Sequence, residues 1–207
     1  MLTVLGRANS INVRKVLWTC EEIGLDYAQE DWGGEHRSTR TPDFLALNPN
    51  GLVPVLRDGD AVLWESNTII RYLAAKHGRE DLLPAEPLAR ARVEQWLDWQ
   101  ATESNNAWRY AFQALVRKHP DYADPGEVQK SAKRWADTTA ILEAQLEKAG
   151  GYVAGPDFTL ADIGVGLAVN RWFLTPIERP DFPAVAAYYD RLGDRPGFRK
   201  YGCNGEP

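Results

Sequence analysis

Cysteine, methionine and histidine are scarce in this sequence of 207 residues, which contains two, one and three of them respectively. The two cysteines, Cys20 and Cys203, form neither a CxxC pair nor a cluster with metal-ligand spacing, which favours a reducing compartment. The three histidines, His36, His77 and His119, are widely separated and form no ligand pattern, so we expect no metal site.

Long apolar runs and a strong charge bias are also missing. No apolar run approaches the roughly 18–20 residues that a helix needs to cross a bilayer, and the first residues, MLTVLGRANS, lack the features of a secretory signal. A net charge of -5 gives no electrostatic reason to expect a nucleic-acid or membrane partner. With 44% hydrophobic and 26% charged residues the chain has an ordinary globular composition. We therefore expect a cytoplasmic globular protein that binds neither nucleic acid nor membrane.

The first 78 residues alternate between strand-like and helix-like segments. We expect strands at Leu2–Leu5, near Tyr27–Trp32, at Val53–Leu56 and at Ala61–Trp64. We expect helices at Asn12–Ile23, after the start signal Thr41-Pro42-Asp43, and after an N-cap at Ser66. The pair Asp58-Gly59 predicts that the last two strands form a hairpin. The order β-α-β-α-β-β-α predicts a small mixed sheet covered by helices.

Strand signals become weak after Gly78, where a proline-bounded connector (residues 81–87) leads into a helical region. We expect helices at Leu88–Lys118, Gly126–Ala149 and Ile163–Leu174, and a last one after Pro183. The sequence FTLADI (residues 158–163) predicts a capping box between Thr159 and Asp162, with a purely structural role. We therefore predict two domains, residues 1–78 and residues 86–207, the second of them all helical.

The sequence NGLVPVL (residues 50–56) places a proline inside a strand pattern. Because proline cannot donate to a ladder, we expect Pro54 at the first position of its strand. The Val53–Pro54 bond is a candidate for the cis form, which would turn the N–H and C=O of Val53 toward a ligand. X–Pro bonds are cis in only about 5–6% of cases, so an ordinary trans bond is an equal alternative from these residues alone.

Glu65 and Ser66 follow the last expected strand at the start of a helix. Serine at this position is usually just a cap. Here a carboxylate, a hydroxyl and free helix-terminal N–H groups would occur together, and this combination matches an α-amino-acid end. The ligand's carboxylate would bind the N–H donors, and its ammonium group would bind the acid.

The loop after the first strand carries Ser10, and the helix predicted from Asn12 starts almost at once. Either residue could be only the N-cap of that helix, and taken by itself this is the simpler interpretation.

These three motifs, in this order and spacing, resemble those of cytosolic glutathione transferases. The resemblance covers essentially the whole chain and includes NPNGLVPVL, WESNTIIRYL and FTLADI. It implies an α/β thioredoxin-like N-terminal domain, followed by an all-α helical domain that contributes the pocket for the second substrate. It also implies glutathione as co-substrate, a small hydrophobic electrophile as the other partner, and a homodimer.

The roles of the family's residues carry over to the matching positions of this chain. Val53, before Pro54, would pair with the cysteinyl backbone of glutathione. Glu65 and Ser66 would hold its γ-glutamyl end, and Ser10 would meet its sulfur.

The residues of the first loop also indicate the subtype. The first tyrosine is Tyr27, too late for this loop, and Ser10 stands where the disulfide-forming classes carry a cysteine. The Ser-x-Asn pattern resembles theta-like and related bacterial classes. We therefore expect Ser10 to donate a hydrogen bond to the thiolate of glutathione, with Asn12 as a second donor or positioning residue.

One departure from the family's pattern concerns the glycyl carboxylate of glutathione. The family often has a lysine directly before the Val-Pro pair, and this chain has Leu52. Arg37, Arg40 or Trp32 could substitute for it, and the sequence does not choose among them.

The pocket for the second substrate is expected between the two domains, a common location for ligand sites. Asn105, Trp108, Arg109 and Phe112 share one face of the long helix. The aromatic residues suit a hydrophobic electrophile, and Arg109 would favour an anionic group. The alternative is a packed helical face with Arg109 in a salt bridge.

Several functions fit the resemblance. The expected one is conjugation of glutathione to an electrophile. The alternatives are a glutathione-dependent peroxidase, disulfide reductase, dehalogenase or isomerase, or a binding module of the same fold that has lost catalysis. The presence of Ser10, Glu65 and Ser66 together argues against the silent module, since a scaffold has no need of all three.

Overall fold

A computed structural model describes all residues from Met1 to Pro207. The chain divides into two compact units, Met1–Pro84 and Ala85–Pro207. No helix in it is both long enough and apolar enough to cross a membrane.

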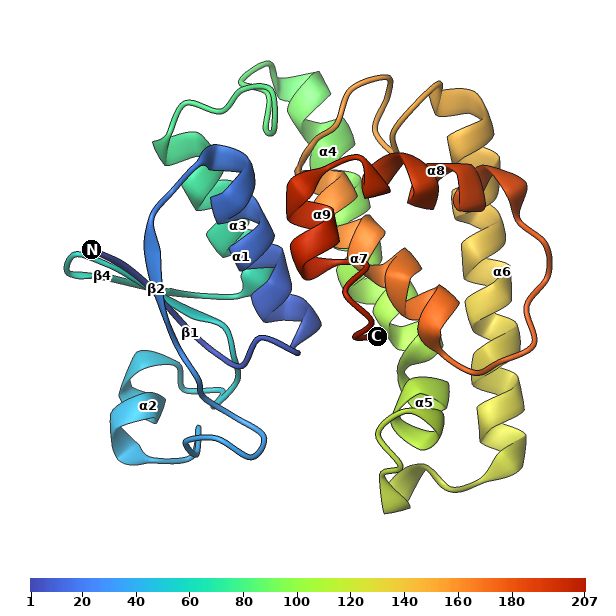
Figure 1. The fold of residues 1–207 in the computed structure, drawn as a ribbon, viewed down its shortest axis with the longest axis horizontal. Helices are drawn as coiled ribbons and strands as arrows, with labels where there is room; N and C mark the ends of the chain where they lie inside the picture. Colours follow the sequence, from blue (N-terminus) through green and yellow to red (C-terminus); the bar gives the residue numbers. More distant parts are fainter. The chain divides into compact units, whose positions relative to one another are not determined.

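The first unit contains a mixed sheet of four strands in the order β2-β1-β3-β4 (Figure 1). The strands are β1 (Leu2–Leu5), β2 (Tyr27–Glu30), β3 (Val55–Asp58) and β4 (Ala61–Trp64). The pair β1 and β2 is parallel, whereas β3 is antiparallel to both β1 and β4. The predicted hairpin at Asp58-Gly59 is confirmed by the pairing of Asp58 with Ala61.

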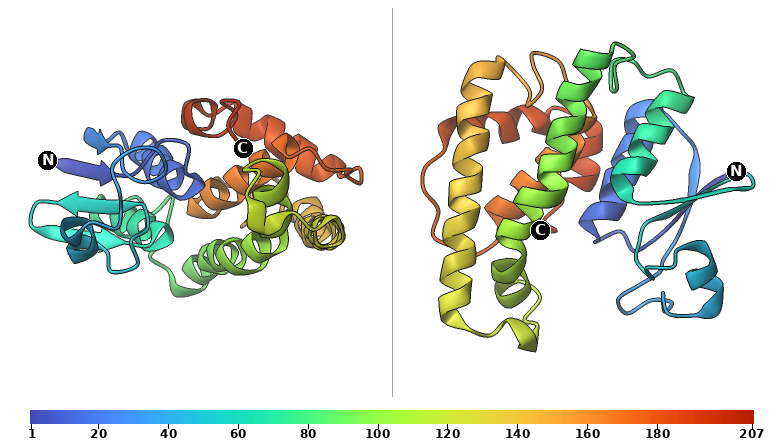
Figure 2. Two further views of the ribbon diagram at one scale, coloured as in Figure 1. Left: turned by 90° about the horizontal axis from the view of Figure 1, so that it is seen from below. Right: turned by 180° about the vertical axis from the view of Figure 1, so that it is seen from behind.

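Helices cover both faces of this sheet. They are α1 (Ile11–Ile23), α2 (Pro42–Leu47) and α3 (Ser66–Lys76). On one face, Phe44 of α2 packs against Leu5 and Val55. Because side chains alternate along a strand, the neighbouring residues Val4 and Leu56 face the other side, where α1 and α3 lie together (Figures 1 and 2).

Two boundaries in this unit differ from the predictions. The strand predicted at Val53–Leu56 begins at Val55, which pairs with Leu5, so Pro54 precedes the strand instead of opening it. The N-cap of α3 is Glu65, and Ser66 is the first residue of the helix. Because proline has no N–H to donate to the ladder, β3 begins directly after Pro54, two residues later than the predicted start at Val53.

The second unit is all helical, as predicted. Its helices are α4 (Pro87–Trp99), η1 (Gln100–Ser104), α5 (Asn105–Leu115), η2 (Pro120–Tyr122), α6 (Pro125–Ala149), α7 (Leu160–Leu174), α8 (Pro183–Gly193) and α9 (Pro196–Tyr201). Every residue from Leu160 to Trp172 is buried, so α7 is the central helix of this unit. A helix that is mainly apolar on every side belongs in a core, which is where α7 lies together with its few polar residues.

The helix predicted at Leu88–Lys118 is present as a contiguous helical stretch, but its regular turns and its end differ from the prediction. It is interrupted by one π-helical stretch, η1, and it stops at Leu115. Within η1 the Thr102 hydroxyl donates to the Asp98 carbonyl at 2.9 Å, and the Gln100 amide donates to Asn105 Oδ1 at 2.9 Å. Such side-chain bonds accompany a locally widened turn, which hydrophobic periodicity does not reveal.

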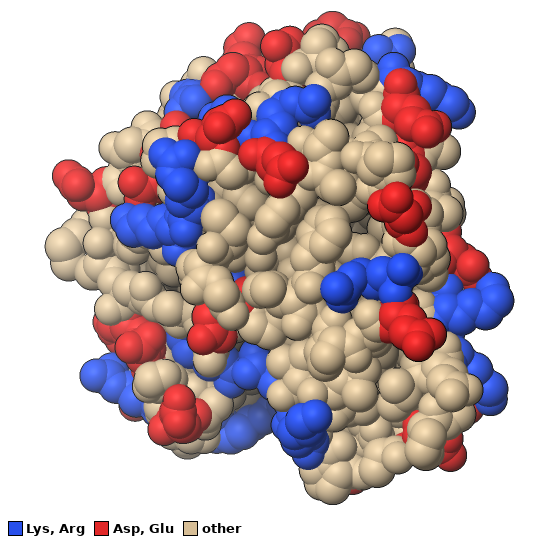
Figure 3. All heavy atoms as spheres, turned by 45° about the vertical axis from the view of Figure 1, so that its right-hand side comes forward, with Lys and Arg blue, Asp and Glu red and all other residues tan.

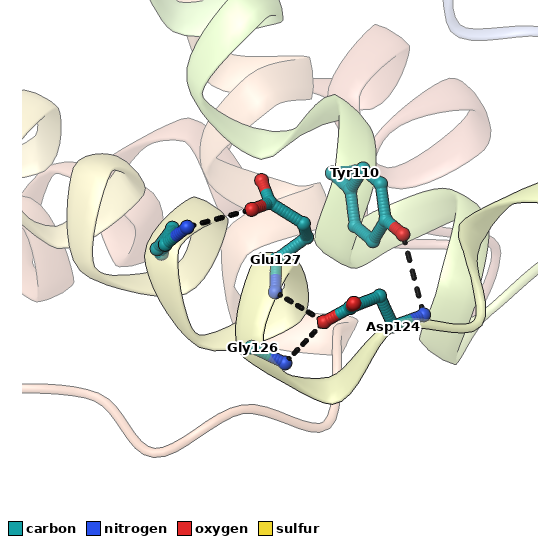
Figure 4. A network of polar contacts seen from close by, with 5 residues as sticks. Tyr110, Asp124, Gly126 and Glu127 are labelled. Atoms are coloured by element: carbon teal, nitrogen blue, oxygen red, sulfur yellow. Dashed lines mark hydrogen bonds and ion pairs between the residues drawn. The ribbon is translucent and has the colours of Figure 1, made fainter.

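The start of α6 shows why this helix begins at Pro125. Asp124 Oδ1 accepts hydrogen bonds from the N–H groups of Gly126 at 2.7 Å and Glu127 at 3.1 Å, while Tyr110 Oη accepts from the Asp124 N–H (Figure 4). The aspartate therefore satisfies two N–H groups that the first turn leaves without partners, and the tyrosine ties the cap to α5.

The capping box at Thr159 and Asp162 is confirmed. One carboxylate oxygen of Asp162 accepts the N–H of Thr159 at 2.8 Å, and the other accepts the N–H of Val153 at 2.9 Å and the hydroxyl of Tyr188 at 3.0 Å. Asp162 is completely buried. It therefore joins the start of α7, the preceding loop and α8 through one side chain.

Charged side chains of both signs alternate over the face of the molecule drawn in Figure 3. No field of a single sign forms on that face, in keeping with the small net charge of -5.

Candidate active site

The loop between β1 and α1 leaves the Ser10 hydroxyl available. Ser10 occupies the N-cap position of α1, with its N–H bonded to the Arg7 carbonyl at 3.1 Å, but its side chain does not cap the helix. The simpler interpretation, in which Ser10 is only a cap, is therefore wrong for its side chain. The result is a half-buried hydroxyl without a partner beside a helix N-terminus, where negative charge is stabilised.

Asn12 and Ser66 lie in contact, although 54 positions separate them in the sequence. The Ser66 hydroxyl donates to Asn12 Oδ1 at 3.3 Å. The structure thus brings together the start of α1 and the start of α3. Because the amide oxygen of Asn12 accepts this bond, its amide nitrogen is directed elsewhere and can donate to a ligand.

The Val53–Pro54 bond is cis, as the sequence motif suggested. Val53 lies outside the strand that follows, and neither its N–H nor its C=O takes part in a backbone hydrogen bond. Val53 is half-buried, so both groups remain available to pair with the backbone of an extended peptide.

Gly6 lies between the first turns of α1 and the segment before Pro54. A Cβ atom at this position would lie 2.5 Å from Val13 Cγ2 and 3.0 Å from Val53 Cβ. Glycine is therefore required for α1 and the segment before Pro54 to approach each other this closely.

Replacing Gly6 with alanine is expected to push Val53 outward, which lowers both the melting temperature and the affinity for a ligand on this segment. An overpacked contact costs about 1–3 kcal/mol, so we expect glutathione to bind about tenfold more weakly, as measured by titration calorimetry. Gly59→Ala is the matched control, because Gly59 also has a positive φ but no atom within 4 Å of its added Cβ. It should lose stability alone. Equal glutathione affinity in both variants would contradict this role of Gly6.

Glu65 is exposed and adopts φ 70°, an unfavourable backbone conformation for a residue other than glycine. Strain of this kind is maintained where the surroundings fix it, often at ligand sites. Glu65 directly precedes the first turn of α3, whose leading N–H groups include that of the buried Ser66. An acid and helix-terminal donors are thus adjacent, as the amino-acid end of a ligand requires.

The two arginines predicted for the glycyl carboxylate have different surroundings. Arg37 is exposed, lies 5.4 Å from the centre of the Trp32 ring, and pairs with Glu30 at 3.4 Å. Arg40 Nη1 donates to the Asn50 carbonyl at 3.2 Å. This position is next to Gly51, where an added Cβ would lie 2.7 Å from Arg40 Nη1.

Sequence reasoning missed Asn9, whose side-chain oxygen is buried without a hydrogen-bond partner next to Ser10. An unsatisfied buried acceptor is costly and would take a donor from a ligand. No periodicity or motif marks this residue. Cys20, by contrast, belongs to the core as expected, and burial raises the pKa of its thiol to about 12, which makes it an unsuitable nucleophile.

The four residues predicted for the electrophile pocket separate into three groups within the second unit. Trp108 and Phe112 are buried in an aromatic cluster, whereas Arg109 is exposed. Asn105 is half-buried and accepts a hydrogen bond from Gln100. The guanidinium that lies over both rings is that of Arg171, which sequence reasoning missed, and Arg117 also lies 5.5 Å from the centre of the Phe112 ring. A single cation in the otherwise apolar segment IGVGLAVNRWFL was the available signal.

Two family models match parts of this chain. Residues 9–76 match the family model of the glutathione S-transferase N-terminal domain, and residues 125–191 match that of the C-terminal domain. The chain is 40% identical over 202 residues to glutathione S-transferase GstB of Escherichia coli, covering 97% of each protein. It is 38% identical to glutathione S-transferase 3 of Zea mays, covering 96% of this chain and 92% of the relative.

A crystal structure of a theta class glutathione S-transferase from Xanthomonas axonopodis pv. citri with glutathione bound superposes with a TM-score of 0.90 at 39% identity. The match covers 97% of this chain and 96% of the other. Both the sequence and the fold therefore agree over nearly the whole length, and this chain belongs to the glutathione S-transferase family of enzymes.

Proposed function

We propose that this transferase binds reduced glutathione along the segment before Pro54, stabilises its thiolate with Ser10, and joins the sulfur to a small hydrophobic electrophile. The observation that carries the proposal is the hydrogen bond between Asn12 and Ser66. It brings the loop with the unpaired serine hydroxyl beside the strained Glu65 and the first turn of α3. The hydroxyl that donates a hydrogen bond to the thiolate and the site for the γ-glutamyl end then lie within the reach of one tripeptide.

Each part of glutathione has a partner in this arrangement. The carboxylate of the γ-glutamyl end accepts from the N–H groups at the start of α3, and its ammonium group pairs with Glu65. The cysteinyl N–H and C=O pair with the free C=O and N–H of Val53. The Ser10 hydroxyl donates to the thiolate, and the Asn12 amide nitrogen acts as a second donor or positions the ligand.

Arg40 is the better of the two arginines for the glycyl carboxylate. Arg37 already pairs with Glu30 and lies over Trp32. Arg40 lies over Asn50 and Gly51, two residues before the segment that holds the cysteinyl backbone, and its bond to the Asn50 carbonyl fixes the guanidinium there. It occupies the neighbourhood that Leu52, 60% exposed and uncharged, leaves without a cation.

The reaction forms a carbon–sulfur bond. The thiolate attacks an electrophilic carbon, a leaving group such as halide departs with the electron pair of the broken bond, and the thiol proton is released to solvent. A hydrogen bond to a charged sulfur, worth about 1.5–3 kcal/mol, lowers the thiol pKa by roughly one to two units. Because nucleophilicity falls with pKa, the net gain is only a few-fold, and orientation of the sulfur contributes more.

The remaining assignments are broader. The relative from Xanthomonas carries glutathione in its structure, which supports glutathione as the co-substrate here. Two free cysteines, neither of them in a disulfide, suit a reducing cytoplasm. We further propose, as membership of the family implies, that the protein acts as a homodimer in the detoxification of reactive electrophiles.

Glu65→Gln tests the proposed glutamyl site. Removing the charge is expected to raise the dissociation constant of glutathione about 5- to 20-fold, since one exposed charge-assisted bond is lost, with little change in kcat at saturating glutathione. Titration calorimetry and conjugation of a chlorodinitrobenzene measure the two effects. Glu35→Gln, the same change in an exposed loop residue, is the control. Unchanged affinity in Glu65→Gln, or a wild-type protein that does not conjugate, would refute the proposal.

A further inference from the structure

The side chain of Asn48, at the end of α2, is buried in a segment that is otherwise largely exposed. Only 3% of Asn48 is accessible, whereas Pro49, Asn50 and Leu52 are exposed. Its amide nitrogen donates to the Leu52 carbonyl at 2.8 Å, and its Oδ1 accepts the N–H of Asn50 at 3.1 Å and the side-chain amide of Asn50 at 3.0 Å. A buried amide with three hydrogen bonds fixes the loop around it.

The hydrogen bond from Asn48 to Leu52 determines the direction of the next N–H group. The peptide between Leu52 and Val53 is trans, since Val53–Pro54 is the only cis bond in the chain. In a planar trans peptide the C=O and the N–H point in opposite directions. Because its C=O is directed at Asn48, this peptide directs the N–H of Val53 away from Asn48, and that N–H makes no backbone hydrogen bond.

The side chain of Val53 is anchored separately from this peptide. It packs against the cluster of Leu5, Phe44 and Val55 on the face of the sheet that α2 covers. Asn48 is attached to the same cluster, because its own N–H donates to the Phe44 carbonyl at 2.9 Å in the last turn of α2. Rotation of the peptide before Val53 is the freedom that this packing leaves, and the amide of Asn48 removes it.

A second series of hydrogen bonds connects Asn48 with Arg40. Arg40 Nη1 donates to the Asn50 carbonyl at 3.2 Å, and Asn50 donates both its N–H and its side-chain amide to Asn48. In the proposed site Arg40 binds the glycyl carboxylate of glutathione, whereas Val53 binds the cysteinyl backbone. Side chains in one hydrogen-bond network affect each other's energies, so this series provides a physical link between the two contacts.

We propose that Asn48 is a positioning residue for glutathione, which holds the Leu52–Val53 peptide so that the N–H of Val53 faces the cysteinyl carbonyl of the ligand, and which couples this contact to Arg40. The inference rests on the proposed function, in which the cysteinyl backbone lies along Val53. Asn48 itself does not touch the ligand. An N–H that is already oriented need not be ordered on binding, and a buried side chain can raise the affinity in this way.

Two ligands that differ at one amide test the proposal, namely glutathione and an isostere with a trans-alkene in place of the cysteinyl–glycyl amide. The isostere has no acceptor for the Val53 N–H, so the wild type should bind it about 3- to 10-fold more weakly than glutathione, as titration calorimetry measures. In Asn48→Ala this ratio of dissociation constants should fall to less than about half its wild-type value, because the N–H is no longer oriented. The glycyl N–H, which the isostere also lacks, affects both proteins alike.

Thr41→Ala is the matched control for stability. The Thr41 hydroxyl accepts the Phe44 N–H at 3.4 Å at the other end of α2, so this variant also weakens the helix but leaves the Leu52 carbonyl bonded. It should lower the melting temperature and keep the wild-type ratio. Asn48→Asp is an isosteric second variant, since it keeps an acceptor for Asn50 but places an oxygen against the Leu52 carbonyl, and its ratio should fall as in Asn48→Ala. Wild-type ratios in both Asn48 variants, or a reduced ratio in Thr41→Ala, would overturn the positioning role.

The same measurements separate this proposal from the proposed function. If the wild type prefers glutathione to the isostere and both Asn48 variants do so equally, Asn48 has no positioning role and the proposed function stands. If the wild type binds the two ligands equally, or does not bind glutathione, Val53 does not hold the cysteinyl carbonyl, and the positioning role is overturned together with that part of the proposed function.

A double-mutant cycle tests the coupling to Arg40. Arg40→Met should raise the dissociation constant of glutathione about 5- to 20-fold in the wild type, through the loss of a charge-assisted bond. In Asn48→Ala the same change should have an effect at least about twofold smaller, because the hydrogen bonds that join Arg40 to the peptide before Val53 are already broken. Arg37→Met is the control, since Arg37 pairs with Glu30, and its effect should be equal in both backgrounds. Equal effects of Arg40→Met in the two backgrounds would contradict the coupling.

Discussion

Replacing Ser10 with alanine is expected to raise the pKa of the thiol of bound glutathione by roughly one to two units while leaving the affinity for glutathione nearly intact. The hydroxyl is the donor that the sulfur loses, and a hydrogen bond to a charged group is worth about 1.5–3 kcal/mol. In the proposed site the affinity for glutathione depends on other residues, since we assign its backbone to Val53 and its glutamyl end to Glu65 and the first turn of α3.

The thiolate fraction near neutral pH should accordingly fall roughly 10- to 25-fold in Ser10→Ala. Ultraviolet difference titration of the glutathione complex measures this fraction directly, and the pH–rate profile of conjugation should shift to higher pH by the same amount. At pH values above the raised pKa the rate should recover, because the less stabilised thiolate is intrinsically more nucleophilic.

Ser10→Thr is the matched control, since it keeps a hydroxyl at the same position and should keep most of the pKa depression. The N-cap geometry tolerates both changes, because the Ser10 side chain makes no capping bond that alanine would remove. A pH–rate profile that is identical in Ser10→Ala and the wild type would remove Ser10 from the role of thiolate donor.

Replacing Asp162 with asparagine is expected to lower the free energy of unfolding of the helical unit by about 2–4 kcal/mol at pH 7. The two carboxylate oxygens accept the N–H groups of Val153 and Thr159, at 2.9 and 2.8 Å. An amide has one oxygen and one NH2 group, so in either orientation a buried N–H loses its acceptor and faces another donor. Urea denaturation followed by circular dichroism measures the effect.

The free energy of unfolding that Asp162→Asn loses relative to the wild type should grow as the pH falls. Burial raises the pKa of Asp162 from 3.8 to about 6 in the folded protein, although hydrogen bonds from Val153, Thr159 and Tyr188 oppose the increase. Because the folded-state pKa is above the unfolded one, the folded state binds the proton more tightly. The resulting stabilisation is full below about pH 4 and disappears as the pH rises through about 6.

Asparagine cannot bind this proton, so the difference between the wild type and Asp162→Asn should be larger at pH 5 than at pH 7 by about 1.4 kcal/mol. Taking the difference cancels the other titrating groups, which both proteins share. Asp157→Asn, the same change at an exposed position five residues earlier, should show neither the loss nor its pH dependence. If the difference in the free energy of unfolding between the wild type and Asp162→Asn became smaller on acidification, the raised pKa of Asp162 would be contradicted.

Most elements of the fold were predictable because their signals are local. The spacing of apolar residues in α1, the Asp-Gly hairpin and the capping box at Thr159 each depend on a few neighbouring residues, and each is present in the structure. The errors occurred where distant parts of the chain determine a local conformation. The π-helical stretch η1 interrupts a regular periodicity, and β3 begins at Val55 because its partner Leu5 sets the register.

In the candidate site, too, some features could be predicted from the sequence and others depend on tertiary contacts. By itself the sequence determined which groups are present, namely a serine hydroxyl before α1, an acid and a serine where α3 begins, and a proline just before β3. Their proximity depends on tertiary contacts. The Asn12–Ser66 hydrogen bond and the close packing of Gly6 against Val13 and Val53 join segments that a linear pattern cannot relate.

Arg171 shows this limit most clearly. The sequence indicates that Arg171 belongs to a mainly apolar helix. It could not reveal that the guanidinium lies over Trp108 and Phe112 and donates a hydrogen bond to the oxygen of Pro207. Local sequence determines helices, caps and turns because those interactions act over a few residues. The pairing of a buried charge depends on the packing of α5, α7 and the segment after α9, which only the folded chain brings together.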